Sequence, residues 1–195
     1  TYNAFLVVDD AHGLGVLGDT GAGVLEKLNI TQKQVPLLIG TFGKSFGASG
    51  AFVSGDQLLI DTFIQKARTY IYTTAMLPAL AATISRAIDL VSTGNALREK
   101  INELINHYKT LIHESSLPKV QSGTAIQPLI IGDAKAAVDL SNALYDVNIL
   151  ALAIRPPTVP KNTSRLRISF TAAHSKEQIS TLVSAIKNNI RPEYA

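Results

Sequence analysis

The sequence contains no cysteine among its 195 residues. Disulfide frameworks, thiolate metal sites and cysteine nucleophiles are therefore excluded. The sequence also has little excess of positive over negative charge. The formal net charge is +3, and the lysine and arginine residues are scattered along the chain. Nucleic-acid binding needs a basic face or stripe, and the sequence shows neither. We therefore expect no nucleic-acid partner.

Long apolar runs are missing as well. Polar residues interrupt every apolar stretch well before the roughly 18 residues that span a bilayer, so we expect no membrane partner. The first residues lack the basic region and the small-residue cleavage site of a signal peptide, and there is no initiator methionine. We expect a cytoplasmic protein, and a chain that is a fragment of a longer one.

What the sequence does contain is typical of an α/β fold. Hydrophobic residues make up 46% of the chain and charged residues 17%, which suits a globular protein with a sizeable core. Short apolar runs without alternation predict strands buried in a mostly parallel sheet with flanking helices, and they lie at 5–8, 37–39 and 51–53. Apolar residues at helical spacing predict helices over 56–66, 78–91 and 95–114.

A second, smaller α/β unit is predicted in the carboxyl-terminal half. The break at Ser92-Thr93-Gly94-Asn95 separates two helical patterns, so we expect domains of 1–93 and 94–195. Apolar patterns in the second domain predict strands over 125–131, 149–154 and 165–170, with a helix over 134–146. A capping box at Ser175 predicts the start of the last helix.

Two glycine motifs resemble nucleotide-binding motifs, but neither has the neighbouring residues and elements that nucleotide binding requires. The run Gly13-Leu14-Gly15-Val16-Leu17-Gly18 fits GxGxxG, but it does not directly follow a strand and no helix opens at its last glycine. The run Gly43-Lys44-Ser45 resembles the end of a P-loop. The first glycine of that motif would fall at Leu38, so the phosphate-binding loop is absent.

Polar residues follow two of the predicted strands, at the position where open α/β sheets bind ligands. Asp9 and His12 follow the first strand, and Lys44 follows the second. A partly desolvated lysine has an accessible neutral amine for imine chemistry. An aspartate there can hold a pyridine nitrogen protonated, which makes pyridoxal phosphate an electron sink, and Thr41 can offer a hydroxyl to the phosphate.

Each of these residues also has an ordinary explanation when it is taken alone. A lysine beside glycine is common in solvated turns, an aspartate can cap a helix, and a histidine can sit in a loop. The residues by themselves therefore leave a cofactor site and a set of unrelated loop residues both open.

The spacing of two segments carries a resemblance to a known family. Val8-Asp9-Asp10-Ala11-His12-Gly13, about thirty residues before Thr41-Phe42-Gly43-Lys44, resembles the α-oxoamine synthases, which are fold-type I pyridoxal-phosphate enzymes. Further matching segments are 125–130, 153–160, 165–167 and 171–174, so the resemblance covers essentially the whole chain. Members condense an amino acid with an acyl thioester and release carbon dioxide. Within the family, this chain is similar to the branch that joins L-alanine to a pimeloyl thioester in biotin biosynthesis.

The resemblance implies a role for each matched residue around the cofactor. Lys44 would hold pyridoxal phosphate as a Schiff base and act in catalysis together with Asp9 and His12. Asp9 would pair with the pyridine nitrogen and His12 would contact the ring oxygen. Thr41 would contact the phosphate from the same subunit. The fold implied is the second half of the large cofactor domain plus the small carboxyl-terminal domain.

The resemblance also implies contacts from residues outside the segments 8–13 and 41–44. Thr73 and Thr74 would approach the phosphate from the neighbouring subunit of a homodimer. Arg155 would bind the substrate carboxylate, and Thr158 lies in the same substrate loop. A guanidinium fork suits a carboxylate, although a surface ion pair would explain Arg155 equally well without the resemblance.

Family members have roughly as much chain again before the position of Thr1, and that half supplies further cofactor contacts. Three alternatives follow for function: an alanine-specific enzyme whose acyl carrier is coenzyme A or a carrier protein, another α-oxoamine synthase such as 2-amino-3-ketobutyrate ligase, and a non-catalytic half-enzyme.

Overall fold

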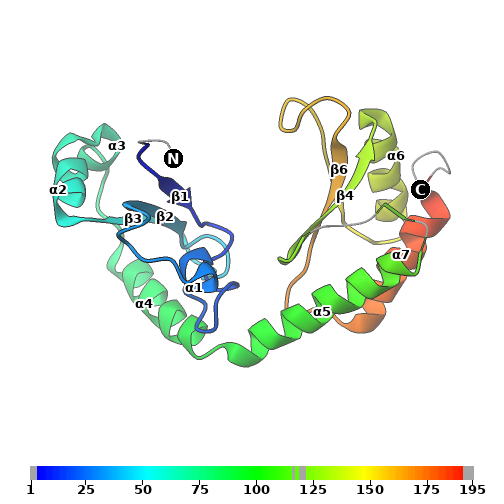
Figure 1. Ribbon diagram of the computed structural model, residues 1–195, viewed down its shortest axis with the longest axis horizontal. Helices are drawn as coiled ribbons and strands as arrows, with labels where there is room; N and C mark the ends of the chain where they lie inside the picture. Colours follow the sequence, from blue (N-terminus) through cyan, green and yellow to red (C-terminus); the bar gives the residue numbers. More distant parts are fainter. Residues whose placement is uncertain (1–3, 116, 119–121, 191–195) are drawn as a thin grey trace. The chain divides into compact units, whose positions relative to one another are not determined.

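The computed structural model describes residues 4–115, 117–118 and 122–190. The chain divides into two compact units, 1–98 and 99–195, each with its own sheet (Figure 1). The division falls inside the helix α5 (Asn95–His113), later than the break predicted after Thr93. The first turn of α5 belongs to the first unit because the Arg98 guanidinium donates to the carbonyl oxygens of Val91 at 2.6 Å and Asp19 at 3.0 Å.

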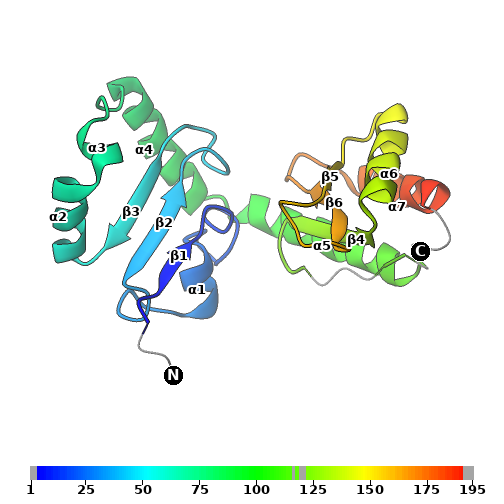
Figure 2. The same ribbon diagram turned by 90° about the horizontal axis from the view of Figure 1, so that it is seen from above.

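The first unit is built on a three-stranded sheet in the order β1–β2–β3 (Figure 2). β1 (Val7–Asp9) runs parallel to β2 (Leu37–Thr41), whereas β3 (Ala51–Gly55) runs antiparallel to β2. The sheet that we expected to be mostly parallel is therefore mixed in the described residues. The short segment 42–50 between β2 and β3 explains the difference, because a parallel return needs a crossover of about a dozen residues or more.

The long helices of the first unit lie where apolar spacing predicts them. α2 spans Gln57–Lys66, and α4 spans Pro78–Ser92 with its proline in the first turn, where no backbone N–H is needed. Two short helices were not predicted, α1 (Val24–Leu28) and α3 (Arg68–Ile71). Each is too short to show a repeating apolar stripe, so periodicity gives no signal for it.

The predicted burial of β1 is not found. β1 is an edge strand, and Phe5, Leu6 and Val7 are 57%, 50% and 47% exposed. Among the described residues of this unit, the buried apolar side chains are Leu14, Val35, Leu37 and Ile84. The faces of a strand in such a sheet are covered by packed helices, and the described helices of this unit leave the apolar run 5–7 in contact with solvent.

The second unit has an antiparallel sheet in the order β4–β6–β5. Its strands are β4 (Ile126–Gly132), β5 (Leu152–Ile154) and β6 (Ser164–Ser169). The helix α6 (Ala134–Asp146) packs on all three strands and against α7 (Lys176–Asn189) (Figure 2). The predicted α/β character of this unit is confirmed.

One apolar core holds the second unit together. Its largest fully buried apolar side chains come from α5, β4, β6, α6 and α7: Leu104, Tyr108, Leu129, Leu144, Leu166, Ile179 and Ile186. The predicted capping box at the start of α7 is also confirmed. The Ser175 hydroxyl accepts from the Gln178 N–H at 3.3 Å, and the Gln178 side chain accepts from the Ser175 N–H at 2.9 Å.

In the part of the chain that the structure describes, no helix combines the length and the apolar character needed to cross a bilayer.

Candidate functional site

The predicted cofactor residues of the first unit lie at one end of the sheet, the end at which the parallel strands β1 and β2 both finish. Asp9 ends β1 and Thr41 ends β2, and the two strands are parallel neighbours with Asp9 opposite Ile39. The carboxyl ends of parallel strands meet at the same sheet edge, which is where such sheets bind ligands. Lys44 follows Thr41 closely, and both Asp9 and Lys44 are exposed to solvent.

Asp9 and His12 lie on one loop. The Asp9 carboxylate accepts a hydrogen bond from the Ala11 N–H at 2.9 Å, which fixes the orientation of the carboxylate. His12 is exposed in the turn that follows, where the N–H groups of Gly13 and Leu14 donate to the Asp10 carbonyl oxygen at 3.1 and 3.2 Å. This turn places His12 three residues after Asp9, beyond the same end of β1.

Lys44 lies in a closed loop between β2 and β3. The Phe42 N–H donates to the Gly50 carbonyl at 2.9 Å, and the Ala48 N–H donates to the Phe42 carbonyl at 2.8 Å. The Lys44 carbonyl itself accepts from the Gly47 N–H at 2.9 Å, and Gly47 has a positive φ of 63° that favours glycine. Backbone hydrogen bonds therefore shape the turn that carries the amine.

The Thr41 hydroxyl has two partners within its own loop. It donates to the Gly50 carbonyl at 3.0 Å and accepts from the Gly43 N–H at 3.2 Å. A hydroxyl carries one proton, so Thr41 would have to rotate to donate to a phosphate. Its contact with the cofactor stays a prediction.

Asp10 is a buried carboxylate that sequence reasoning missed. It is 5% exposed, and it accepts from the Val24 N–H at 2.7 Å. Burial raises the pKa of the Asp10 carboxyl, while hydrogen bonds from the N–H groups of Val24 and Gly13 oppose that shift. A side chain at Gly13 or Gly23 would overlap the carboxylate, so these two glycines let the backbone wrap around it.

Side chains from two helices hold the rest of the loop that follows Asp10. The Glu26 carboxylate accepts from the N–H groups of Thr20 at 3.0 Å and Ala22 at 2.9 Å, and the bond from Thr20 is the main cause that lowers the pKa of Glu26. The Arg98 guanidinium donates to the Asp19 carbonyl oxygen at 3.0 Å. The loop 10–24 is thereby fixed at several points along its length.

The remaining predicted residues lie elsewhere in the chain. Thr73 and Thr74 follow α3 in an exposed segment, and the Thr73 hydroxyl donates to the Thr69 carbonyl. Arg155 and Thr158 belong to the second unit, where they are exposed just after β5, and the Thr158 N–H donates to the Arg155 carbonyl at 3.1 Å. The roles of all four stay predictions.

The chemistry of the grouped residues fits pyridoxal phosphate. The loops at this sheet edge present an exposed amine on Lys44, a fixed carboxylate on Asp9 and an imidazole on His12. These are the groups that an aldehyde, a pyridine nitrogen and a ring hydroxyl require. Across the described residues, no cluster of three or more histidine, aspartate or glutamate side chains is arranged to hold a metal ion.

A family model described as aminotransferase class I and II matches residues 1–186. The chain belongs to this family. It is 48% identical over 190 residues to the 8-amino-7-oxononanoate synthase of Thioalkalivibrio sulfidiphilus, which covers 97% of this chain and 48% of that protein. It is also 48% identical over 185 residues to the enzyme of that name from Marinobacter nauticus, with 95% and 47% covered. The chain thus spans about half the length of the curated relatives it matches.

Solved structures agree with the sequence comparison. The crystal structure of 8-amino-7-oxononanoate synthase from Francisella tularensis matches with a TM-score of 0.88 and 28% identity, over 97% of this chain and 56% of that one. Serine palmitoyltransferase from S. paucimobilis, with a bound PLP–myriocin aldimine, matches with a TM-score of 0.87 and 27% identity, over 96% and 47%. The resemblance to α-oxoamine synthases and the predicted fold class are confirmed.

Proposed function

We propose that this chain forms the carboxyl-terminal half of an 8-amino-7-oxononanoate synthase, a pyridoxal-phosphate-dependent acyltransferase of biotin biosynthesis. The reaction joins L-alanine to a pimeloyl thioester, carried by coenzyme A or a carrier protein, and releases carbon dioxide and the free thiol. The observation that carries the proposal is the 48% identity over 97% of this chain. The grouping of Asp9, His12 and Lys44 at one sheet edge supports it.

Each residue of the site has a defined task in this reaction. When bound, pyridoxal phosphate supplies an electron sink for the bonding electrons left at the α-carbon of alanine. The Lys44 amine would hold the cofactor, and once the amine of alanine has displaced it, the free Nζ would accept the α-proton. The Asp9 carboxylate favours a proton on the pyridine nitrogen, because an adjacent anion stabilises the cationic form. His12 donates to the ring oxygen from the same loop as Asp9.

Arg155 binds the alanine carboxylate in this proposal. Its guanidinium offers two parallel N–H donors, and a carboxylate accepts both at once. Thr158 lies in the same turn as Arg155, which the backbone hydrogen bond of 3.1 Å closes.

We also propose that the working protein is a homodimer with further polypeptide against the first unit. Large apolar side chains around α2 and α3 are exposed, among them Leu58 at 79%, Tyr72 at 79% and Leu77 at 71%. Exposed apolar side chains of this size support a covering partner in this region. A second copy covering Tyr72 and Leu77 would bring Thr73 and Thr74 to its cofactor. A cytoplasmic location stays a prediction.

A second α-oxoamine synthase activity has support from one observation. Serine palmitoyltransferase, whose name indicates a different amino acid and a longer acyl chain, matches the fold nearly as closely. An enzyme such as 2-amino-3-ketobutyrate ligase is a further candidate of this kind. Turnover with alanine, glycine and serine in turn separates these activities, and we expect alanine to give the highest kcat/KM.

The decisive test asks whether pyridoxal phosphate attaches to Lys44. The holoenzyme is reduced with borohydride, digested, and analysed for a peptide that carries the reduced cofactor. We expect the label on Lys44 and no label or product formation in Lys44→Ala. Lys66→Ala, which removes an exposed lysine at the end of α2, serves as the matched control and should behave like wild type. Normal turnover by Lys44→Ala would reject the proposal, and absence of label and product in the wild type would favour a non-catalytic half-enzyme.

A further inference from the structure

The two reactive groups of the site lie on separate loops. Asp9 leads into a turn that Asp10 and Leu14 close through a backbone hydrogen bond of 3.2 Å. Lys44 lies in the loop 42–50, which Phe42 and Ala48 close through their own backbone bond. Each of these bonds shapes one loop, and neither sets the separation between the two.

Ser45 links the loops directly. It follows Lys44 in sequence, and its hydroxyl donates a hydrogen bond to the carbonyl oxygen of Leu14. Leu14 is a buried residue of the first unit at 8% exposure, and its own N–H is bonded to the Asp10 carbonyl. The acceptor is therefore a fixed point on the loop that carries Asp9 and His12.

Gly15 makes this approach of the two loops possible. A Cβ at Gly15 would lie 2.6 Å from Ser45 Cβ and 2.7 Å from Ser45 Oγ, closer than real Cβ atoms approach such groups. Gly15 also has a φ of 80°, a conformation that other residues adopt rarely, and its N–H donates to the Gly21 carbonyl at 2.8 Å. A larger residue at this position would push Ser45 away from Leu14.

We propose that Ser45 is a positioning residue, which holds the Lys44 turn at a fixed distance from the loop of Asp9 and His12. The inference rests on the proposed function, because only a shared cofactor requires the Lys44 amine and the Asp9 carboxylate to be held at a fixed separation. Ser45 itself touches neither cofactor nor substrate in this account. It acts through the backbone on either side of Lys44.

The rate of covalent attachment depends on where the Lys44 amine lies relative to the bound cofactor. Lys44 and Ser45 are both exposed, and the ring contacts nearby, Phe42 with Phe46 and with Phe52, stay within the loop and its own strand, so they do not tie the turn to the loop of Asp9. Without the Ser45 hydroxyl, the amine can shift relative to a cofactor bound by Asp9. A displacement of about 1 Å is enough to cost ~10²-fold in rate.

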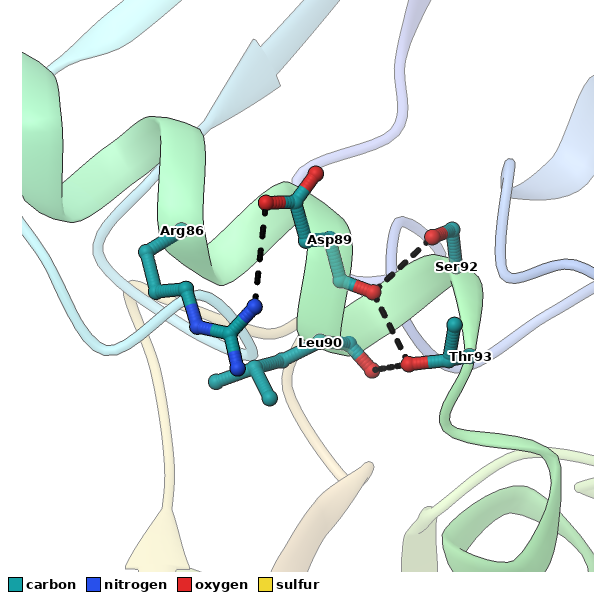
Figure 3. A network of polar contacts seen from close by, with 5 residues as sticks. All are labelled: Arg86, Asp89, Leu90, Ser92 and Thr93. Carbon is teal, nitrogen blue, oxygen red and sulfur yellow. Dashed lines mark hydrogen bonds and ion pairs between the residues drawn. The ribbon is translucent and has the colours of Figure 1, made fainter.

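The test compares Ser45→Ala with a matched serine variant in the holoenzyme. Ser92 also donates its hydroxyl to a backbone carbonyl, that of Asp89 at 2.9 Å, but it does so within the exposed end of α4 (Figure 3). Ser92→Ala therefore removes the same kind of hydrogen bond from the same unit without touching either loop. A further variant, Ser45→Thr, keeps the hydroxyl and tests for rescue.

Two quantities are measured after the cofactor is removed and added back: the affinity of non-covalent binding, and the rate of covalent attachment to Lys44 at saturating pyridoxal phosphate. We expect Ser45→Ala to attach the cofactor ~10-fold or more slowly, with affinity changed by less than about threefold. Ser92→Ala should match wild type, and Ser45→Thr should recover attachment to within about threefold of wild type. A merely structural role would lower the thermal midpoint and leave the attachment rate of the folded protein unchanged.

The outcomes separate this proposal from the one on which it rests. Attachment by Ser45→Ala at the wild-type rate overturns the positioning role while leaving Lys44 as the attachment site. Equal slowing in Ser92→Ala, or no recovery in Ser45→Thr, overturns it as well. Failure of the wild type to attach the cofactor at Lys44 rejects the proposed function, and the positioning role falls with it.

Discussion

Replacement of Asp10 by alanine should loosen the loop that carries the candidate site. The Asp10 carboxylate is 5% exposed and accepts from the Val24 N–H at 2.7 Å, so it joins the start of the loop 10–24 to its end. Alanine removes both carboxylate oxygens. The Val24 N–H then loses its partner, and the glycine-lined space at Gly13 and Gly23 loses the group that fills it.

The size of the effect follows from the kind of bond that is lost. A partly buried donor without its partner costs about 1–3 kcal/mol, with bonds to charged acceptors at the upper end of the range. The carboxylate also carries a desolvation cost that alanine relieves, which places the net loss near 2 kcal/mol. A change of about 2 kcal/mol corresponds to a roughly 30-fold shift in the equilibrium between closed and open loop.

Hydrogen–deuterium exchange measures this equilibrium at the bond itself. We expect the Val24 amide of Asp10→Ala to exchange about 30-fold faster than in wild type when exchange is limited by loop opening. Asp61→Ala is the matched control, because Asp61 accepts a hydrogen bond from Gln57 at 2.8 Å on the exposed face of α2. Its effect at Val24 should be negligible. A change of less than about threefold in Asp10→Ala would show that the carboxylate does not hold the loop.

Three further perturbations test the remaining assignments. Burial raises the pKa of Asp10 above the ordinary value of 3.8, so the part of its contribution to stability that comes from protonation is fully present below pH 3.8 and is lost as pH rises through the folded-state pKa, while the hydrogen bond from Val24 remains. Urea unfolding should show this loss in wild type and not in Asp10→Asn, and identical pH profiles would contradict it. Asp9→Asn should lower kcat by ~10²-fold or more while the cofactor still binds, and a rate within about threefold of wild type would move the electron-sink role elsewhere. Arg155→Lys keeps the charge but loses the guanidinium fork, so alanine titration should show weaker binding, weaker still in Arg155→Ala, with Lys44 attachment intact. Unchanged alanine affinity in both variants would make Arg165 or Arg167 the next candidates.

Apolar periodicity predicted the long helices because their apolar residues recur along one face, whether that face is buried, as in α6, or exposed, as in α2. The helices α2, α4 and α6 begin and end within about two residues of their predicted limits, and the Ser175 capping box marks the start of α7. Periodicity could not find α1 or α3, which are shorter than two turns. It also predicted burial of β1 from its apolar run, and burial depends on what covers a strand, which a local pattern does not contain.

The residues of the candidate site also differ in whether the sequence could predict them. Asp9, His12 and Lys44 could be found from the sequence because they follow apolar runs, and parallel pairing of the first two strands then brings them to one edge. Ser45 and Asp10 could not be found in this way. Their partners are the backbone groups of Leu14 and Val24, and every residue type presents the same backbone carbonyl and, proline excepted, the same N–H.

The glycines between Asp10 and α1 do carry a signal, although it differs from the nucleotide motif that they match. A Cβ at Gly15 would collide with Ser45, and one at Gly21 would come within 2.8 Å of the Arg98 guanidinium. At Gly13, Gly18 and Gly23 a Cβ would overlap a carboxylate, that of Asp10 or Glu26. Each of these glycines therefore marks a point where a polar side chain, from the loop itself, from the loop 42–50 or from a helix, reaches the loop backbone. Phosphate-binding glycines leave room for a ligand, whereas these leave room for the protein's own side chains, which then set the position of Asp9 and His12.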